Sequence, residues 1–162
     1  MTAEQTELYS LLVPLQGERL LVPRACVAEV IAFVAPELAE TDQPVPSWFL
    51  GFITWNDRRL PVVSFEAMSG DQAKRRPGRM RIVVFNTLGE AFEGGYYGMI
   101  TQGFPQLVRV NADVLTAETE KGWADGQPVI CRARMINEFP LIPDMERLED
   151  MIAGACGAEQ TA

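Results

Sequence analysis

The sequence contains no histidine among its 162 residues. This absence excludes a Ser-His-Asp triad, a Cys-His pair, a phosphohistidine carrier and a histidine-ligated metal site. It also removes the side chain that most often serves as a general base or as a pH switch near neutrality. Any catalysis would therefore depend on carboxylates, lysines or the backbone.

Cysteine is scarce as well. The chain has Cys26, Cys131 and Cys156, and no two of them form a C-x-x-C pair. Thiols so few and so scattered exclude a metal knuckle and a secreted disulfide framework, and they fit a reducing cytosol. Because Cys26 and Cys131 stand in apolar stretches, we expect both to be buried and inert.

Long hydrophobic runs and an excess of positive charge are also missing. No apolar run approaches the ~18 residues of a membrane span, and residues 1–7 are too polar for a signal peptide. With 14 basic against 22 acidic side chains, the formal net charge is -8, which disfavours nucleic-acid binding. We expect a cytoplasmic chain with no membrane insertion and no nucleic-acid partner.

What the chain has in abundance is short extended segments separated by turns. They cover residues 8–15, 20–22, 50–55, 58–65, 80–86, 95–101, 104–110, 129–136 and 139–142. Gln16-Gly17 and Asn56-Asp57 are predicted to form hairpin turns between the strands that flank them. Residues 27–33 favour one helical turn followed by a short strand, and residues 111–126 favour a long loop. One helix is expected, with Pro143 as its first residue and Gly154 as its stop. This pattern predicts a mainly β chain, built as a barrel or sandwich.

The strand at residues 129–136 shows the clearest alternation. Val129, Cys131, Ala133 and Met135 share one face, which we expect to point inward. Prolines inside the extended segments, Pro61 among them, indicate an edge strand or a position where the amide need not pair.

Three clusters invite a functional interpretation. Five positive charges within residues 74–81 indicate a solvated loop or a docking patch for an acidic partner. Gly94, Gly95 and Gly98 lack the Gly-Lys-Ser/Thr ending of a phosphate loop, so we expect a hairpin there. The carboxylates Glu29, Asp57 and Glu66 would be the acid and base of an alternative, a small β-barrel enzyme or ligand-binding domain.

An aromatic concentration surrounds Gly51. From this glycine onward, Phe52 and Thr54 share one face of the strand, while Ile53 and Trp55 share the other. Trp48 and Phe49 precede it. Apolar groups that point both ways predict a segment covered on both sides, either by the core or by another protein.

These residues carry a family likeness. Residues 45–65 hold Gly51 at the start of a strand, a two-residue turn, and a return strand with Pro61-Val62-Val63. Upstream, Val27-Ala28-Glu29-Val30 is similar to a Val-x-Glu-Ile element. Together they resemble the core motif of CheW-like domains, and the likeness extends over residues 8–152.

The resemblance implies a fold and a class of function. The fold would be two five-stranded, SH3-like β-barrel lobes around a shared hydrophobic centre, with a C-terminal helix. It would form a single domain over residues 8–153, with flexible termini at 1–7 and 154–162. CheW-like proteins are non-enzymatic adaptors that use no cofactor and no metal.

The resemblance also implies partners. CheW-like proteins couple methyl-accepting chemoreceptors to a CheA-type histidine kinase by docking the regulatory domain of that kinase within a chemosensory array. Carried over by position, the partner-binding residues would be Val27, Glu29, Val30, Gly51, Trp55, Asn56, Asp57 and Arg58.

Four positions depart from the family pattern. Thr54 stands where the family usually has asparagine, Asn56 where it has arginine, Asp57 where it has glycine, and Ser64 where it has aspartate. The departures affect the turn that would contact the receptor. They favour an accessory member of the kind found in systems that control type IV pili and twitching motility, rather than the principal flagellar adaptor.

Overall fold

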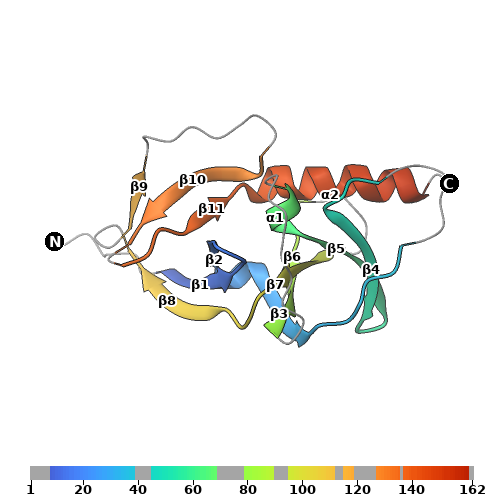
Figure 1. The fold of residues 1–162 in the computed structure, drawn as a ribbon, viewed down its shortest axis with the longest axis horizontal. Helices are drawn as coiled ribbons and strands as arrows, with labels where there is room; N and C mark the ends of the chain where they lie inside the picture. The colour runs from blue at the N-terminus through green and yellow to red at the C-terminus, as the bar shows by residue number, and fades with distance from the viewer. Residues whose placement is uncertain are drawn as a thin grey trace.

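Two β-sheets and a long C-terminal helix make up the fold of the computed structural model (Figure 1). The structure describes residues 8–38, 45–68, 79–89, 95–111, 115–118, 127–135 and 137–160. In spatial order, the six-stranded sheet contains β8 (Gln106–Val110), β1 (Leu8–Pro14), β2 (Arg19–Pro23), β11 (Leu141–Pro143), β10 (Val129–Arg134) and β9 (Thr116–Glu118).

The second sheet has five strands and is formed by the middle of the chain. Its spatial order is β3 (Val27–Ala32), β6 (Arg81–Asn86), β7 (Tyr96–Thr101), β5 (Arg58–Val63) and β4 (Phe49–Trp55). The chain therefore starts in one lobe, passes through the other, and returns to the first. Among the described residues, the helical segments with defined bounds are η1 (Arg24–Cys26), α1 (Phe65–Met68) and α2 (Met145–Gln160).

Tight turns join the strands of two hairpins as the sequence predicts. Gly17, at φ 80°, closes the β1–β2 hairpin. Asn56 and Asp57 close the β4–β5 hairpin with φ values of 48° and 61°, the backbone of a two-residue I′ turn.

Pro61 lies inside the five-stranded sheet, in β5, opposite Phe52 of β4. The backbone N–H and C=O of Phe52 both bond to Glu37 instead, at 2.9 and 3.0 Å. Pairing of β5 with β7 begins only at Val62. Pro61 therefore occupies a position where no amide is needed, which is one of the two alternatives that the sequence left open.

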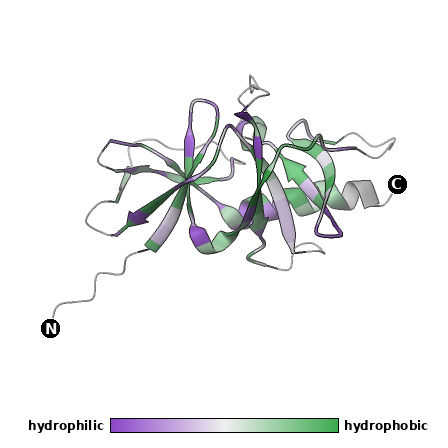
Figure 2. Cartoon of the chain, turned by 90° about the horizontal axis from the view of Figure 1, so that it is seen from below, coloured by the Kyte–Doolittle hydropathy of each residue, from purple (hydrophilic) through white to green (hydrophobic). Residues whose placement is uncertain are grey.

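The hydrophobic core lies mainly between the two sheets. One large cluster joins Val13 and Leu20 of the first sheet, Phe85 of the second, and Leu148 and Ile152 of α2. Figure 2 shows hydrophobic stretches running along the strands of both lobes. A shared hydrophobic centre with a C-terminal helix packed on it is thus confirmed.

Each lobe also has a smaller core of its own. The interior of the five-stranded lobe is filled by Ile53, Leu60, Ile82, Val84 and Ile100, among others. Gly98 of β7 faces the same interior, where a Cβ would lie 2.9 Å from a methyl group of Ile82. The role of Gly98 is therefore close packing and not a hairpin turn.

The first lobe differs from the expected five strands because a sixth strand forms in residues predicted as a loop. In β9, Ala117 pairs with Ala133 of β10. A strand of three residues in a polar stretch has too little hydrophobic alternation to be recognised from sequence.

Two expectations about helices are corrected or refined. The helical turn η1 comes just before the predicted stretch, and β3 follows it as expected. Helix α2 differs from its expected bounds at both ends: it begins at Met145, because Pro143 belongs to β11, and it continues past Gly154 to Gln160. Ala155 and Cys156, the two residues after the expected stop, are 5% exposed and pack into the central core, so tertiary packing overrides the glycine.

The alternation in β10 is interrupted. Val129 and Ala133 are buried as expected, but Cys131 and Met135 are only half-buried. A β-bulge between Val129 and Cys131 shifts the register against β11 and breaks the strict period of two. The expectation of a buried Cys131 is therefore wrong.

Candidate functional site

The residues expected to bind partners lie in the two edge strands of the five-stranded sheet, in the β4–β5 turn and at the start of β5. Glu29 lies in β3 at one edge, and Trp55 lies in β4 at the other. The indole Nε1 of Trp55 nevertheless donates a hydrogen bond of 2.7 Å to Glu29 Oε2. The sheet must therefore curl until its edges approach each other, as in a small barrel.

An aromatic and a basic side chain complete this cluster. The Tyr96 ring lies 5.0 Å from the Trp55 ring, between centroids, and the Arg58 guanidinium lies 5.3 Å from the Tyr96 centroid. Trp55 and Tyr96 also pack on the core inside this lobe. We call Glu29, Trp55, Arg58 and Tyr96 the mouth cluster. It presents a carboxylate, a guanidinium and two half-buried rings at one end of the lobe.

Tyr96 is the member that the sequence analysis missed. It follows Gly95, and it faces Trp55 only because β7 lies between β5 and β6 in the sheet. Sheet order of this kind is not visible in sequence spacing. Asn56 and Asp57 form the exposed tip of the turn beside the cluster.

Val27 and Val30 contribute to the core as well as to the surface. Both are half-buried and pack against the central cluster. The register of β3 against β6 shifts between Val27 and Glu29, which marks a β-bulge in β3. The bulge lies between Val27 and Val30 along the strand. Of the three β3 residues expected to bind partners, Glu29 is the exposed one.

Gly51 lies beneath the surface. Its φ is 122°, and a Cβ there would lie 2.5 Å from the carbonyl carbon and oxygen of Glu37. The glycine lets the segment at Glu37 and Leu38 cross β4 at close range. A partner would therefore meet this crossing segment, whereas Gly51 itself is buried.

The aromatic stretch around Gly51 is covered on both sides by the chain itself. Phe49 and Phe52 face the central cluster, and Ile53 and Trp55 face the interior of the five-stranded lobe. The Arg59 guanidinium lies 3.8 Å from the Phe52 ring centroid. No second protein is needed to explain why this strand is apolar on both faces.

The departure at Ser64 is structurally conservative. Ser64 precedes α1, and the N–H of Ala67 donates to its Oγ at 3.3 Å. Its carbonyl accepts the first helical bond, from Met68 at 3.1 Å. Serine and aspartate are both favoured at such an N-cap, so this replacement keeps the cap. Thr54, Asn56 and Asp57 are exposed and change the surface instead.

The three carboxylates proposed as acid and base have different surroundings. Glu29 binds Trp55, and Asp57 lies exposed in the β4–β5 turn. Glu66 is 6% exposed and accepts the backbone N–H of Gln16 at 2.8 Å. Glu29 and Glu66 each accept a hydrogen bond from the chain itself, which gives these two carboxylates structural roles.

Two of the three thiols, Cys26 and Cys156, are buried. Burial, and to a smaller extent the charge of Glu149, raises the pKa of Cys26 above the usual thiol value. In the part of the chain that the structure describes, no three metal-ligating side chains gather.

The other two sequence clusters are only partly visible. Most of the basic residues at 74–81, and also Gly94, lie outside the described residues. Arg81 is held by its own surroundings, because it donates to the Met80 carbonyl at 2.9 Å and lies 4.8 Å from the Phe104 ring centroid. Gly95 has φ 73° and accepts from Thr87 at 3.0 Å, consistent with the expected hairpin between β6 and β7.

Comparisons with known proteins agree with this architecture. A family model described as the CheW-like domain matches residues 10–152. The scaffolding protein TtCheW from Thermoanaerobacter tengcongensis has a similar fold, with a TM-score of 0.69 and 15% sequence identity over 88% of each chain. No curated protein matches the sequence. Among the described residues, no helix is long and apolar enough to cross a membrane. The chain belongs to the CheW-like domain family, whose members are non-enzymatic scaffolding adaptors in chemotaxis signalling.

Proposed function

We propose that this chain is a cytoplasmic adaptor that couples methyl-accepting chemoreceptors to a CheA-type histidine kinase. The observation that carries the proposal is the family match over residues 10–152, which spans both lobes and the first half of α2. A protein that retains both lobes retains two separate surfaces, and an adaptor needs at least two. The scaffolding role stated for TtCheW points the same way.

The edge strand β3 is the favoured surface for the regulatory domain of the kinase. In the five-stranded sheet, β3 pairs with β6 on one side only, within the described residues. An unpaired strand edge offers backbone donors and acceptors to a partner strand or loop. Ala28, Glu29 and Ala32 are exposed along it. Small side chains there let a partner approach the backbone closely.

The mouth cluster and the Asn56–Asp57 turn are the favoured surface for the receptor. Trp55 is fixed by Glu29 and Tyr96, so the cluster is held in place before a partner arrives. Such preorganisation lowers the entropy cost of binding. The adaptor would act by holding kinase and receptor in register. A signal would pass only if the kinase or receptor state changes how tightly the adaptor docks.

A titration tests the kinase contact. Isothermal titration of the chain with the regulatory domain of a CheA-type kinase from the same bacterium should give saturable binding. Ala28→Arg places a bulky charge on the exposed edge of β3 and should raise the Kd at least tenfold. Ala117→Arg, on exposed β9 of the other sheet, is the matched control and should leave the Kd within about twofold.

Two results would contradict the proposal, in whole or in part. If the parent chain binds no kinase regulatory domain and no receptor encoded near it, the adaptor role is wrong. If Ala28→Arg and Ala117→Arg bind as the parent does, the kinase contact is elsewhere. Val27 is unsuitable for this test because it packs against the core.

The cellular process proposed for this adaptor is the control of type IV pili. The departures at Thr54, Asn56 and Asp57 change the exposed turn that would meet a receptor, which supports an accessory adaptor in a system that controls type IV pili. Deletion of the gene should then reduce twitching motility and leave swimming intact. Loss of swimming alone would contradict this assignment.

A further inference from the structure

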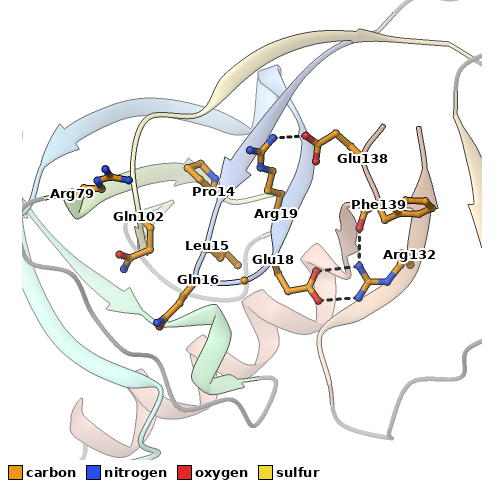
Figure 3. A pocket seen from close by; sticks show the side chains of 11 residues that line it. Pro14, Leu15, Gln16, Glu18, Arg19, Arg79, Gln102, Arg132, Glu138 and Phe139 are labelled. Atoms are coloured by element: carbon orange, nitrogen blue, oxygen red, sulfur yellow. Dashed lines mark hydrogen bonds and ion pairs between the residues drawn. The ribbon is translucent and has the colours of Figure 1, made fainter. Parts of the chain in front are cut away.

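A pocket lies between the two lobes, and its lining residues are not among those proposed above to contact the kinase or the receptor. Its volume is about 640 Å³. Pro14, Gln16 and the start of β2 form one part of the wall, the β10–β11 connection forms another, and Arg79 and Gln102 of the second lobe form a third (Figure 3). A hollow of this size lies in the range typical of small-molecule sites.

The charge of this pocket is opposite to that of the whole chain. It contains three arginines and two glutamates, a formal sum of +1, in a protein of formal charge -8. The arginines come from residues 19, 79 and 132, far apart in sequence, so only the fold brings them together. A local reversal of sign built from three separate segments favours an anionic ligand.

Two of the three guanidinium groups are held in fixed orientations. Arg132 donates to both carboxylate oxygens of Glu18, at 3.0 and 2.9 Å, and also to the Phe139 carbonyl at 2.7 Å. Arg19 donates to Glu138 at 2.7 Å. These pairs neutralise both glutamates, so neither opposes an anion with a full charge.

Arg79 is different. It lines the pocket on the side opposite the two ion pairs, beside Gln102 (Figure 3). Among the residues that the structure describes, it has no carboxylate partner. An exposed guanidinium directed at a concave polar wall is a ready donor for an oxyanion.

Gln16 is another polar residue of the pocket wall. Its Oε1 is buried and has no hydrogen-bond partner among the described residues. Its backbone is held, because the N–H donates to buried Glu66 at 2.8 Å. Because that oxygen is buried, a ligand cannot reach it; Gln16 contributes to the pocket wall, and its amide N–H groups are donors that an oxyanion can accept.

We propose that this pocket between the lobes, lined by Arg79, Gln16 and Gln102, binds a small oxyanion, with Arg79 as the principal charge partner. The shared chemistry is a compact group of anionic oxygens, supplied by a carboxylate or by a phosphate. The pocket is concave and flanked by two ion pairs, which suits a small molecule better than a protein surface. The inference is independent of the adaptor role and would stand if that role failed.

Titration followed by NMR of the 15N-labelled full chain tests the site. Citrate represents the carboxylate source and inorganic pyrophosphate the phosphate source, each added at constant ionic strength so that general screening does not change. At least one should produce saturable shifts of the Gly17 and Gln102 backbone amides. The anion that binds more tightly identifies the source.

Three variants make the test specific. Arg79→Gln should weaken binding at least fivefold. Arg24→Gln removes the same charge from exposed η1, outside the pocket, and should leave the Kd within about twofold. Glu138→Gln frees Arg19 from its ion pair and should tighten binding. Because Arg79 and Arg24 are exposed, neither replacement disturbs the core.

Several results would overturn the proposal. One is the absence of saturable shifts with both anions up to about 10 mM. Another is equal weakening by Arg79→Gln and Arg24→Gln, which would show attraction to net charge only. A third is a set of shifts confined to residues outside the pocket.

Discussion

Gly51→Ala should destabilise the fold strongly, although the change adds one methyl group. The backbone at Gly51 has φ 122°, which L side chains rarely adopt, and the new Cβ would lie 2.5 Å from the Glu37 carbonyl and 2.9 Å from the Leu38 nitrogen. These neighbours are backbone atoms that cannot rotate away. Backbone strain and overpacking each cost about 1–3 kcal/mol, so we expect a loss of roughly 3 kcal/mol or more.

Urea and thermal unfolding measure this loss. For a chain of this size, each kcal/mol lowers the Tm by about 2–4 °C, so the Tm should fall by roughly 6–12 °C. Two other glycines serve as controls, because a Cβ at either one meets nothing within 4 Å. Gly17→Ala carries only the strain of its positive φ and should cost about 1–2 kcal/mol. Gly154→Ala, inside α2, should stabilise the protein by about 0.5–1 kcal/mol.

The order of the three variants in stability tests the reasoning most directly. A Gly51→Ala variant that unfolds within about 1 kcal/mol of the parent would refute the close approach of the Glu37 segment to β4. Equal losses for Gly51→Ala and Gly17→Ala would show that steric contact contributes nothing. The same reasoning predicts that a binding defect in a Gly51 variant reports on folding and not on a contact surface.

Three further outcomes are expected. A double-mutant cycle of Glu29→Ala and Trp55→Phe should give a coupling of about 1 kcal/mol in unfolding, and strict additivity would contradict the hydrogen bond between them. With a thiol reagent at pH 8, Cys131 should react well before Cys26, because it is half-buried and Cys26 is buried; equal rates would contradict this. Burial, with smaller effects of nearby charge, raises the pKa of Cys26 and that of Tyr97, the latter well above its usual value. Both groups ionise first in the unfolded chain, so the free energy of unfolding should fall as pH rises above about 9, and a flat profile to pH 11 would contradict it.

Local signals in the sequence predicted much of the fold. The hairpins at Gly17 and at Asn56–Asp57 follow from residues that tolerate positive φ between alternating segments. The two-sided apolar pattern from Phe52 to Trp55 predicted a strand covered on both faces, and the two cores provide that cover. These features depend on neighbours in sequence, which is why they could be predicted.

The remaining features depend on contacts between distant segments. The helix passes Gly154 because Ala155 and Cys156 are buried against the core, a gain that local helix propensity does not record. Cys131 is half-exposed because of a bulge that the alternation did not predict. Tyr96 joins the mouth cluster only through the order of strands in the sheet.

The pocket between the lobes could not be predicted from sequence either. Arg19, Arg79 and Arg132 belong to three segments that only the packing of one lobe on the other brings together. Arg79 stood out in the sequence as part of a basic stretch, whereas the other two did not. Charge runs were visible in sequence, but convergent single charges were not.

The most direct test of the adaptor proposal is hydrogen exchange of the full chain with and without a CheA-type kinase regulatory domain. We expect added protection of the β3 amides, at residues 28–32, at concentrations that saturate binding, with the β9 amides unchanged. No change at β3 in a confirmed complex would place the kinase elsewhere. No complex at all, with either kinase or receptor, would contradict the proposed function itself.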